Sequence, residues 1–452
     1  MKIPVSPPSW VKILDRIAAD PQRVQAVVPR RLGPTVAGKY RHWDILRHLE
    51  PPPDLSAEEW WLALKMARHD LTQELPLRDR GGTVFSYSVP PVMHQLLHEI
   101  DRDAAGRIRA AGEVSDARTG EYYLLNSLIE EPIASSQLEG AATTRRVAKE
   151  MLRLGRDPET RGERMILNNH RAMQFVRGMK EEPLTPELVF TIHRIVTEGT
   201  LDDPSAAGRL RRADLSDDDI DVVDNVGNVL HRPPDAAELE ERMAVLCEFA
   251  NATEPFVHPM VRAILLHLWL AYDHPFVDGN GRTARALFYW YTASRGYWLL
   301  EFVSISSILK RAPGKYARAF LYTETDENDA TYFILNQLRV LRQAIDRLHG
   351  YLDRKIREAR ETERLLRRSG TLRDRLNHRQ LALVNHALRN PGFAYTVQSH
   401  RGSHGVSYQT ARTDLLRLAD AELLEKTTVG KKFVFESAPN LRERLKRLDE
   451  ER

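Results

Sequence analysis

The sequence has 452 residues, 42% of them hydrophobic and 8% aromatic, which is enough apolar material for two or three folded domains. A net charge of +3 is too small a basic excess to indicate a nucleic-acid partner by itself. The one cysteine, Cys247, excludes an intrachain disulfide and a cluster of thiolate metal ligands, so we expect a cytoplasmic protein. No segment resembles a signal peptide or a membrane-spanning helix, so no membrane partner is expected.

Helical patterns dominate the chain, and we expect a mainly α fold. Residues 1–84 are charged and are interrupted by prolines at 51–53, which predicts a small helical region of undetermined role. Between residues 85 and 345 apolar residues recur at helical spacing, and Thr185 followed by Pro186 marks the start of one helix. Residues 218–232 break this pattern, because DIDVVDNVGNVLH predicts a β-hairpin turned at 225–228.

The C-terminal part of the chain follows a different pattern. Residues 346–376 are basic and helical, and we expect them to form a connector. In residues 377–452 the helix RQLALVNHALRN is followed by a second helix, which Ser407 caps, and by the hairpin LLEKTTVGKKFVFES. The order of helix, helix and two-stranded wing predicts a small winged helix-turn-helix domain.

The stretch HPFVDGNGRTAR, residues 274–285, joins two apolar helices. Pro259 can open the first helix, whose apolar residues run nearly all round it, so we expect this helix to be buried at the centre of the fold. Pro275 ends the helix and favours an extended His274 at the mouth of the loop. Gly279 and Gly281 permit tight turns and bring backbone N–H groups close to a ligand.

The second helix begins inside this stretch, and its free N–H groups form a natural anion site. Arg282 and Arg285 lie three residues apart on one helix face, where two guanidiniums suit a polyphosphate. Asp278 is a hard oxygen ligand of the kind Mg²⁺ prefers. Each feature alone is more often structural, but their coincidence in one turn predicts phosphoryl or nucleotidyl transfer.

The stretch resembles the signature of the Fic family, His-x-Phe-x-Asp/Glu-Gly-Asn-Gly-Arg-x-x-Arg. The matched positions are His274, Phe276, Asp278, Gly279, Asn280, Gly281, Arg282 and Arg285. The resemblance implies a Fic helical core over residues 85–345, with residues 218–232 as a flap that aligns a target segment by strand addition. The Doc branch, which transfers phosphate, has Lys at the position of Gly281, so the glycine implies nucleotidyl transfer.

The implied activity is that of a protein adenylyltransferase, which moves AMP from ATP to a Ser, Thr or Tyr hydroxyl of a target protein. His274 would be the general base that takes the proton of this hydroxyl. Phe276 would pack inward and fix the loop. Asp278 would hold Mg²⁺ on the α- and β-phosphates.

The resemblance also implies the contacts of the remaining phosphates. Asn280 and the amides around Gly279 and Gly281 would cradle them. Arg282 would steady the leaving pyrophosphate, and Arg285 would hold the γ-phosphate.

SSQLEG, residues 135–140, reads by itself as a helix end closed by glycine. Beside a Fic core it resembles the inhibitory motif Ser/Thr-x-x-x-Glu-Gly/Asn, matched by Ser135, Glu139 and Gly140, in the class whose inhibitory helix precedes the catalytic motif. We expect this helix near residues 125–140. The resemblance implies that Glu139 pairs with Arg285 and so slows transfer. Some Fic enzymes also use this glutamate to remove AMP, and this alternative stays open.

A second hypothesis is a DNA-binding regulator whose Fic core senses nucleotide. Its candidate DNA contacts are Tyr408, Gln409 and Arg412 on the second helix of the C-terminal domain, and Lys431 and Lys432 on the wing. Acidic residues share this region and argue against DNA: they are Asp414, Asp420, Glu422 and Glu425. DNA binding and protein contact therefore remain equal alternatives for this domain, and a homodimer, self-modification and a donor other than ATP remain open as well.

Overall fold

The computed structural model describes residues 1–28, 30, 32–104, 128–214, 220–224, 226–368, 370–390, 392–429 and 432–450. These residues form mostly helices with three small sheets, which confirms the mainly α fold. They divide into two compact units, residues 1–104 with 128–346 and residues 347–450. Helix α16, Thr331–Arg368, runs across the division, so the chain leaves the first unit inside a helix and not in a loop.

The first residues fold as short helices around an apolar cluster of their own. Their bounds are Trp10–Ala18 for α1, Pro21–Val27 for α2, Trp43–Leu46 for α3 and Ala57–His69 for α4. Ile13, Leu46 and Trp61 are fully buried members of this cluster. Ser56 begins α4 with a capping box, in which its hydroxyl accepts from the N–H of Glu59.

Buried polar contacts join this N-terminal region to the rest of the first unit. The Tyr40 hydroxyl donates to Asp329 at 2.6 Å, and the guanidinium of Arg68 donates to the Tyr332 hydroxyl at 3.0 Å. All four side chains are buried, so each hydrogen bond is needed to offset the loss of water. The region before residue 70 is therefore part of the first unit and not a separate domain.

A two-stranded sheet, which was not predicted from the sequence, follows α4 at the end of the region expected to be helical up to residue 84. Strand β1, Thr72–Arg78, pairs antiparallel with β2, Val84–Ser88. Leu75 and Leu77 are buried between exposed neighbours, which is the alternation of a strand. This alternation covers only a few residues of a charged segment, so it does not stand out in the sequence.

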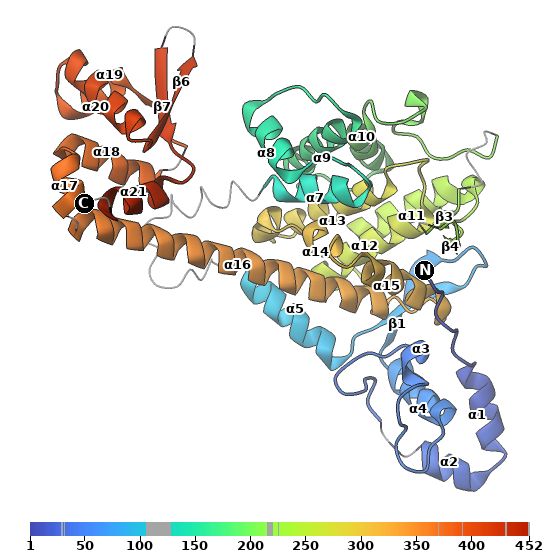
Figure 1. The fold of residues 1–452 in the computed structure, drawn as a ribbon. Helices are drawn as coiled ribbons and strands as arrows, with labels where there is room; N and C mark the ends of the chain where they lie inside the picture. Colours follow the sequence, from blue (N-terminus) through green and yellow to red (C-terminus); the bar gives the residue numbers. More distant parts are fainter. Residues whose placement is uncertain are drawn as a thin grey trace. The chain divides into compact units, whose positions relative to one another are not determined.

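The 274–285 segment lies among helices packed around α12 (Figure 1). The bounds are Pro91–Ala104 for α5, Glu130–Leu138 for α7, Arg145–Leu154 for α8, Arg161–Gly178 for α9, Pro186–Thr197 for α10, Leu239–Asn251 for α11, Pro259–Asp273 for α12, Asn280–Ser294 for α13, Ser306–Leu309 for α14 and Pro313–Thr325 for α15. Short 3₁₀ turns lie at Pro204–Ala206, Ala236–Glu238 and Trp298–Phe302. Every residue of α12 from Met260 to Leu270 is buried, which confirms the buried central helix.

The predicted hairpin forms from two very short strands, β3 (Val222–Val223) and β4 (Val229–His231). The Asp224 carboxylate closes the turn by accepting from the backbone N–H groups of Val226 at 3.0 Å and Asn228 at 2.9 Å. Asn225 and residues 218–219 of the expected flap lie outside the described residues.

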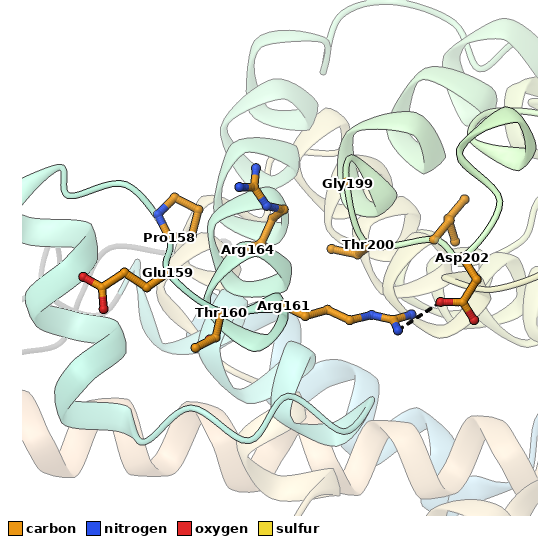
Figure 2. A pocket seen from close by; sticks show the side chains of 9 residues that line it. Pro158, Glu159, Thr160, Arg161, Arg164, Gly199, Thr200 and Asp202 are labelled. Atoms are coloured by element: carbon orange, nitrogen blue, oxygen red, sulfur yellow. Dashed lines mark hydrogen bonds and ion pairs between the residues drawn. The ribbon is translucent and has the colours of Figure 1, made fainter.

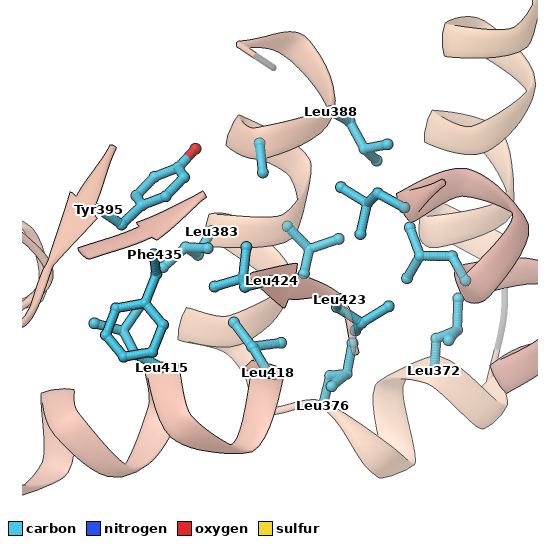
Figure 3. Close-up of a cluster of buried hydrophobic side chains, with 14 of the residues drawn as sticks. Leu372, Leu376, Leu383, Leu388, Tyr395, Leu415, Leu418, Leu423, Leu424 and Phe435 are labelled. Atoms are coloured by element: carbon cyan, nitrogen blue, oxygen red, sulfur yellow. The ribbon is translucent and has the colours of Figure 1, made fainter. Parts of the chain in front are cut away.

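The second unit has its own apolar core, which Figure 3 shows as a cluster of buried leucines with Tyr395 and Phe435. Its elements are Gly370–Arg375 (α17), His378–Arg389 (α18), Tyr395–Thr396 (β5), Val397–His404 (α19), Tyr408–Asp420 (α20), Leu424–Val429 (β6), Lys432–Ser437 (β7) and Leu441–Glu450 (α21). The strand order is β5-β7-β6. Helix α18, the cap of α20 by Ser407 and the β6–β7 hairpin follow the predicted pattern.

Helix α19 and strand β5 were not predicted from the sequence. VQSHRGSH, the sequence of α19, has no apolar periodicity, and a capping box between Thr396 and Ser399 starts the helix. The assignment of this unit as a winged helix-turn-helix stays a prediction.

Asp414 does not belong to the acidic surface on which the sequence analysis placed it. Its side chain is buried on α20, where it accepts from Arg379 at 2.7 Å and from Asn377 at 2.8 Å. The ring of His400 lies 3.3 Å from the same carboxylate. The hydrogen bond and charge of Arg379 hold the pKa of Asp414 below its usual range, although burial opposes the shift.

Among the described residues, the search for a helix both long enough and apolar enough to cross a membrane found none.

Candidate active site

His274 stands directly after α12 in a left-handed conformation, with φ 45° and ψ 53°. The expectation of an extended His274 is therefore wrong. Pro275 disfavours only the right-handed helical region for the residue before it, and the left-handed cap lets the His274 N–H donate to the carbonyl of Leu270 at 3.1 Å. The side chain is half-buried at the start of the loop, as expected.

The imidazole of His274 is held in its neutral form. Burial lowers its pKa to about 4, and the nearby positive charges of His231 and Arg211 act in the same direction. One ring nitrogen hydrogen-bonds the backbone of Ala271, which leaves the other nitrogen with a free lone pair. A neutral imidazole of this kind can accept a proton near neutral pH.

Phe276 and Asn280 keep the loop in one shape. Phe276 is fully buried and stacks on the ring of His193 with 3.8 Å between centroids and 6° between planes. The Asn280 side chain accepts from the N–H of Phe276 at 2.9 Å and donates to its carbonyl at 2.7 Å. Its amide is therefore engaged with the loop, and what Asn280 offers a ligand is its backbone N–H.

His193, on α10, was missed by the sequence analysis. Its Nδ1 accepts from the N–H of Gly208 at 2.9 Å, so Nε2 carries the proton and donates to the carbonyl of Asp278 at 2.8 Å. Burial lowers the pKa of His193 to about 4, which keeps this neutral tautomer. The only signal in the sequence is a histidine on the apolar face of PELVFTIHRIV, which does not distinguish a brace from an ordinary core residue.

The N-terminus of α13 follows His274 closely in the chain. Gly279 is its N-cap with φ 86°, and an added Cβ would come within 2.6 Å of Thr197. Glycine is required there on both counts. The half-exposed carboxylate of Asp278 accepts from the Gly279 N–H at 2.5 Å and lies 3.5 Å from Arg282.

Arg282 and Arg285 do not face solvent. Each is about 1% exposed, although both stand in the first turns of α13. Arg282 donates to the carbonyl of Val196 at 2.8 Å. His274, Asp278, the α13 amides and both guanidiniums therefore all belong to the loop after α12 and the first turns of α13.

Arg285 is paired with the SSQLEG segment. Its NH2 donates to Glu139 at 2.7 Å, and its Nε donates to the Ser135 hydroxyl at 2.8 Å. Glu139 caps the end of α7, and Gly140 follows with φ 93°. An added Cβ on Gly281 would lie 2.3 Å from the Glu139 carboxylate, so glycine at 281 is what allows this pair to form.

Glu131, also on α7, was not predicted as part of the site. It is 3% exposed and accepts from the Ser304 hydroxyl at 2.8 Å, the Ser306 N–H at 3.0 Å and the Ser306 hydroxyl at 2.6 Å. Burial raises the pKa of this carboxyl, and the serine hydrogen bonds oppose the shift. Since Glu131, Ser135 and Glu139 recur every four residues, they share one face of the segment, which is therefore held at both ends.

A polar pocket of about 250 Å³ lies at the start of α9 (Figure 2). Arg161 and Arg164 line it together with residues 199–202, and Arg161 donates to Asp202 at 3.1 Å. Residues 199–202 begin two residues after Thr197, which contacts the 274–285 segment together with Val196.

The candidate DNA contacts belong to the second unit. Tyr408 and Gln409 are exposed at the start of α20, and Arg412 is half-buried one turn later. Lys431 lies outside the described residues. Lys432 is the first residue of β7.

Comparison with known proteins supports the likeness seen in the sequence. Residues 183–292 match the sequence model of the Fic/DOC family. The chain is 33% identical over 126 residues to the protein adenylyltransferase Fic of Nematostella vectensis, covering 27% of this chain and 26% of the relative. It is 25% identical over 270 residues to the protein adenylyltransferase Fic of Culex quinquefasciatus, covering 59% of this chain and 50% of the relative. The chain therefore spans half or less of these curated relatives.

The fold is shared with a Fic family protein from Desulfovibrio desulfuricans G20, with a TM-score of 0.50 and 20% identity over 78% of this chain and 98% of that one. The family match contains the whole 274–285 segment and the hairpin, whereas Ser135 and Glu139 lie before it.

Proposed function

We propose, from the premise that the chain is a Fic domain protein, that it transfers AMP from ATP to a hydroxyl side chain of a protein. One observation carries the proposal: a neutral His274 stands in the same turn as a helix N-terminus with two buried guanidiniums. A base for the hydroxyl and a site for a polyphosphate are thereby side by side, which is what in-line transfer requires.

In this mechanism the free nitrogen of His274 takes the proton of the acceptor hydroxyl as its oxygen attacks the α-phosphorus. The bond between the α-phosphorus and the bridging oxygen breaks, and pyrophosphate leaves. The backbone N–H groups of Asn280 and Gly281 and the Arg282 guanidinium would stabilise the negative charge of the phosphates, and Arg285 would hold the γ-phosphate. Because these groups are buried and already oriented, little reorganisation is needed.

Mg²⁺ fits the donor set of this site as a companion of the nucleotide. No three His, Cys, Asp or Glu side chains gather as a metal cage among the described residues. Asp278 alone presents a half-exposed carboxylate, and Mg²⁺ is commonly held by one or two carboxylates together with substrate phosphates. When bound it would offset phosphate charge, while Asp278 sets its place.

We further propose that the enzyme is autoinhibited. Glu139 occupies the guanidinium of Arg285 that the γ-phosphate needs, so ATP would bind with its α-phosphate out of line. A phosphate could take the place of Glu139 at Arg285, because the Glu139 side chain is 32% exposed and can move away, whereas the Arg285 side chain is 2% exposed and stays in place. This contact supports the proposal that the chain is of the class with an N-terminal inhibitory helix, here α7.

The acceptor would be a protein segment laid along the β3–β4 flap by strand addition, and a second copy of the chain is one candidate acceptor. The experiment that identifies the transferred group compares ATP labelled at the α- or the γ-phosphate, with Mg²⁺ and the Glu139→Gly variant. Protein labelled by the α-label alone supports AMP transfer. Protein labelled by the γ-label would identify a phosphotransferase instead.

A second candidate function is DNA binding by residues 377–450. It is favoured by the burial of Asp414, because this carboxylate is paired inside the unit and does not repel a phosphate backbone. Tyr408, Gln409 and Arg417 are exposed on α20, and the exposed acidic residue of this helix is Asp420, at its last position. Retention on random duplex DNA at low salt, weakened by Arg412→Ala and Arg417→Ala, would support this function. Retention unaffected by these changes and by salt would refute it.

A further inference from the structure

The β3–β4 hairpin is fastened to the end of α12 by two basic side chains, one on each side of the hairpin. Arg211 precedes the hairpin and donates through Nε to the carbonyl of His274 at 2.8 Å, and its backbone N–H donates to the carbonyl of Pro275 at 2.9 Å. His231 lies in β4, with Nε2 2.7 Å from the carbonyl of Tyr272. Arg211 and His231 of β4 therefore both bond carbonyls in the turn that carries His274.

His231 has a second acceptor on its other side. Its Nδ1 lies 2.8 Å from a carboxylate oxygen of Glu324, on α15. A carbonyl and an ionised carboxylate only accept, so both ring nitrogens must carry protons for the two hydrogen bonds to form. The geometry thus calls for an imidazolium, whereas a neutral ring can keep only one of the two contacts.

We propose that His231, as an imidazolium, is a positioning residue that locks the flap against the His274 turn, and that loss of its proton releases the flap. This inference rests on the proposed function only in giving the flap the task of aligning the acceptor. His231 stands opposite Val222 in the strand pair, so its position also sets that of β3. The guanidinium of Arg211 keeps its charge at any pH, so the proposed release concerns the contacts of His231 in β4.

The surroundings of His231 favour the proton. Burial lowers its pKa, but the hydrogen bond and charge of Glu324, the Tyr272 carbonyl and the charge of Asp273 outweigh burial, and the pKa is raised above the ordinary histidine value. Asp273 is itself bound by Arg242 from α11 at 2.9 Å. The Tyr272 ring, whose centroid lies 4.5 Å from that of His231, and His274 are further titratable neighbours. Burial raises the pKa of the Tyr272 hydroxyl and keeps His274 neutral, so neither changes its charge as His231 loses its proton.

The direction in which flap docking depends on pH follows from the raised pKa of His231. A histidine with a raised pKa is fully protonated below that pKa and loses its proton as the pH rises through it. The docked flap is therefore complete on the acid side and released on the alkaline side. A purely structural histidine would show no such dependence.

The test measures hydrogen exchange of the flap peptide, residues 220–232, in the full-length protein without nucleotide, across a pH series and corrected for intrinsic exchange. The His231 pKa is measured in the same samples by NMR of histidine-labelled protein, assigned with His231→Gln. We expect protection of the flap to fall about tenfold as the pH rises through the His231 pKa, the factor for one lost charge-assisted hydrogen bond.

Glu324→Gln is the discriminating variant. A glutamine amide can donate to a neutral Nδ1, so both contacts survive loss of the proton, and protection should stay high across the series. The control is His170→Gln on α9, where the ring lies 3.2 Å from the Gln174 amide, and the flap should behave as in the unaltered protein.

Protection that is independent of pH while His231 titrates would overturn the proposal. So would a Glu324→Gln variant that follows the pH dependence of the unaltered protein. Because no nucleotide is present, neither result depends on whether the protein transfers AMP.

Discussion

Arg285 and Asp414 are both buried charged residues, one in each unit, but their partners differ in number and exposure. Arg285 meets one carboxylate, Glu139, whose side chain is 32% exposed. Asp414 meets Arg379, His400 and Asn377 together. The first pair has one charged partner that can move into solvent, and the second is a closed network.

The difference fits the proposed regulatory role of the first pair and a structural role of the second. Removing the partner of a buried charge is costly unless another partner takes its place. For Arg285 the proposed γ-phosphate would be such a replacement, so its pair with Glu139 could open without lasting cost. For Asp414 the chain offers no replacement, and the network fixes the packing of α20 on α18.

The largest effect is expected from removing Arg285, the member of the Arg285–Glu139 pair that is proposed to bind the γ-phosphate. In the Glu139→Gly background, Arg285→Ala should lower AMP transfer by about 100-fold to 1,000-fold, because the γ-phosphate loses its buried donor. The measurement is the initial rate of label transfer from α-labelled ATP. Arg295→Ala, an exposed arginine at the other end of α13, is the control and should leave the rate unchanged. An equal rate in both variants would mean that Arg285 does not serve the phosphate.

Breaking the closed network should affect stability and not chemistry. Asp414→Ala should lower the free energy of unfolding of the second unit by about 3 kcal/mol or more, because Arg379 and His400 lose their shared partner. Denaturant unfolding followed by circular dichroism measures this. Asp420→Ala, exposed on the same helix, should be nearly neutral. If the two changes cost the same, the network is not structural.

The pH dependence of the transfer rate tests the general base, His274, separately from the inhibitory residue, Glu139. In the Glu139→Gly variant the rate should be constant above the His274 pKa of about 4 and should fall about tenfold for each pH unit below it, because the protonated ring cannot accept the hydroxyl proton. Circular dichroism at each pH checks that the fold survives. A rate that already falls tenfold between pH 7 and 6 would contradict a His274 whose pKa is lowered to about 4.

The smallest effect is expected from weakening the contacts of Arg285 with the inhibitory segment while Glu139 remains in place. Ser135→Ala deletes the acceptor of the Arg285 Nε while Glu139 remains, and should raise transfer by about threefold to tenfold, the factor for one modest hydrogen bond. The initial rate with α-labelled ATP measures it. Unchanged transfer would mean that Ser135 only packs against Arg285.

The site formed by residues 274–285 could be predicted from the sequence, because its residues are close neighbours in the chain. A helix that ends at a proline and a helix that begins at glycines leave little freedom for His274, Asp278 and Arg282. The backbone of His274 was predicted wrongly, since the rule for residues before proline does not account for a left-handed helix cap.

The contacts that brace this turn could not be predicted. His193, Arg211 and His231 lie between 41 and 85 residues before the residues that they contact, and nothing in their local pattern distinguishes them. Asp414 was misplaced for the opposite reason. A charged residue is most often exposed, and only its packing against Arg379 and His400 shows that this one is buried.

The most direct test of the account is label transfer from α-labelled ATP with Mg²⁺ by three proteins: the unaltered chain, Glu139→Gly, and Glu139→Gly combined with His274→Ala. The account predicts strong labelling of protein by Glu139→Gly, weak labelling by the unaltered chain and none by the double variant. Equal labelling by the unaltered chain and Glu139→Gly would contradict inhibition by Glu139. Labelling that survives His274→Ala would contradict the assignment of His274 as the general base.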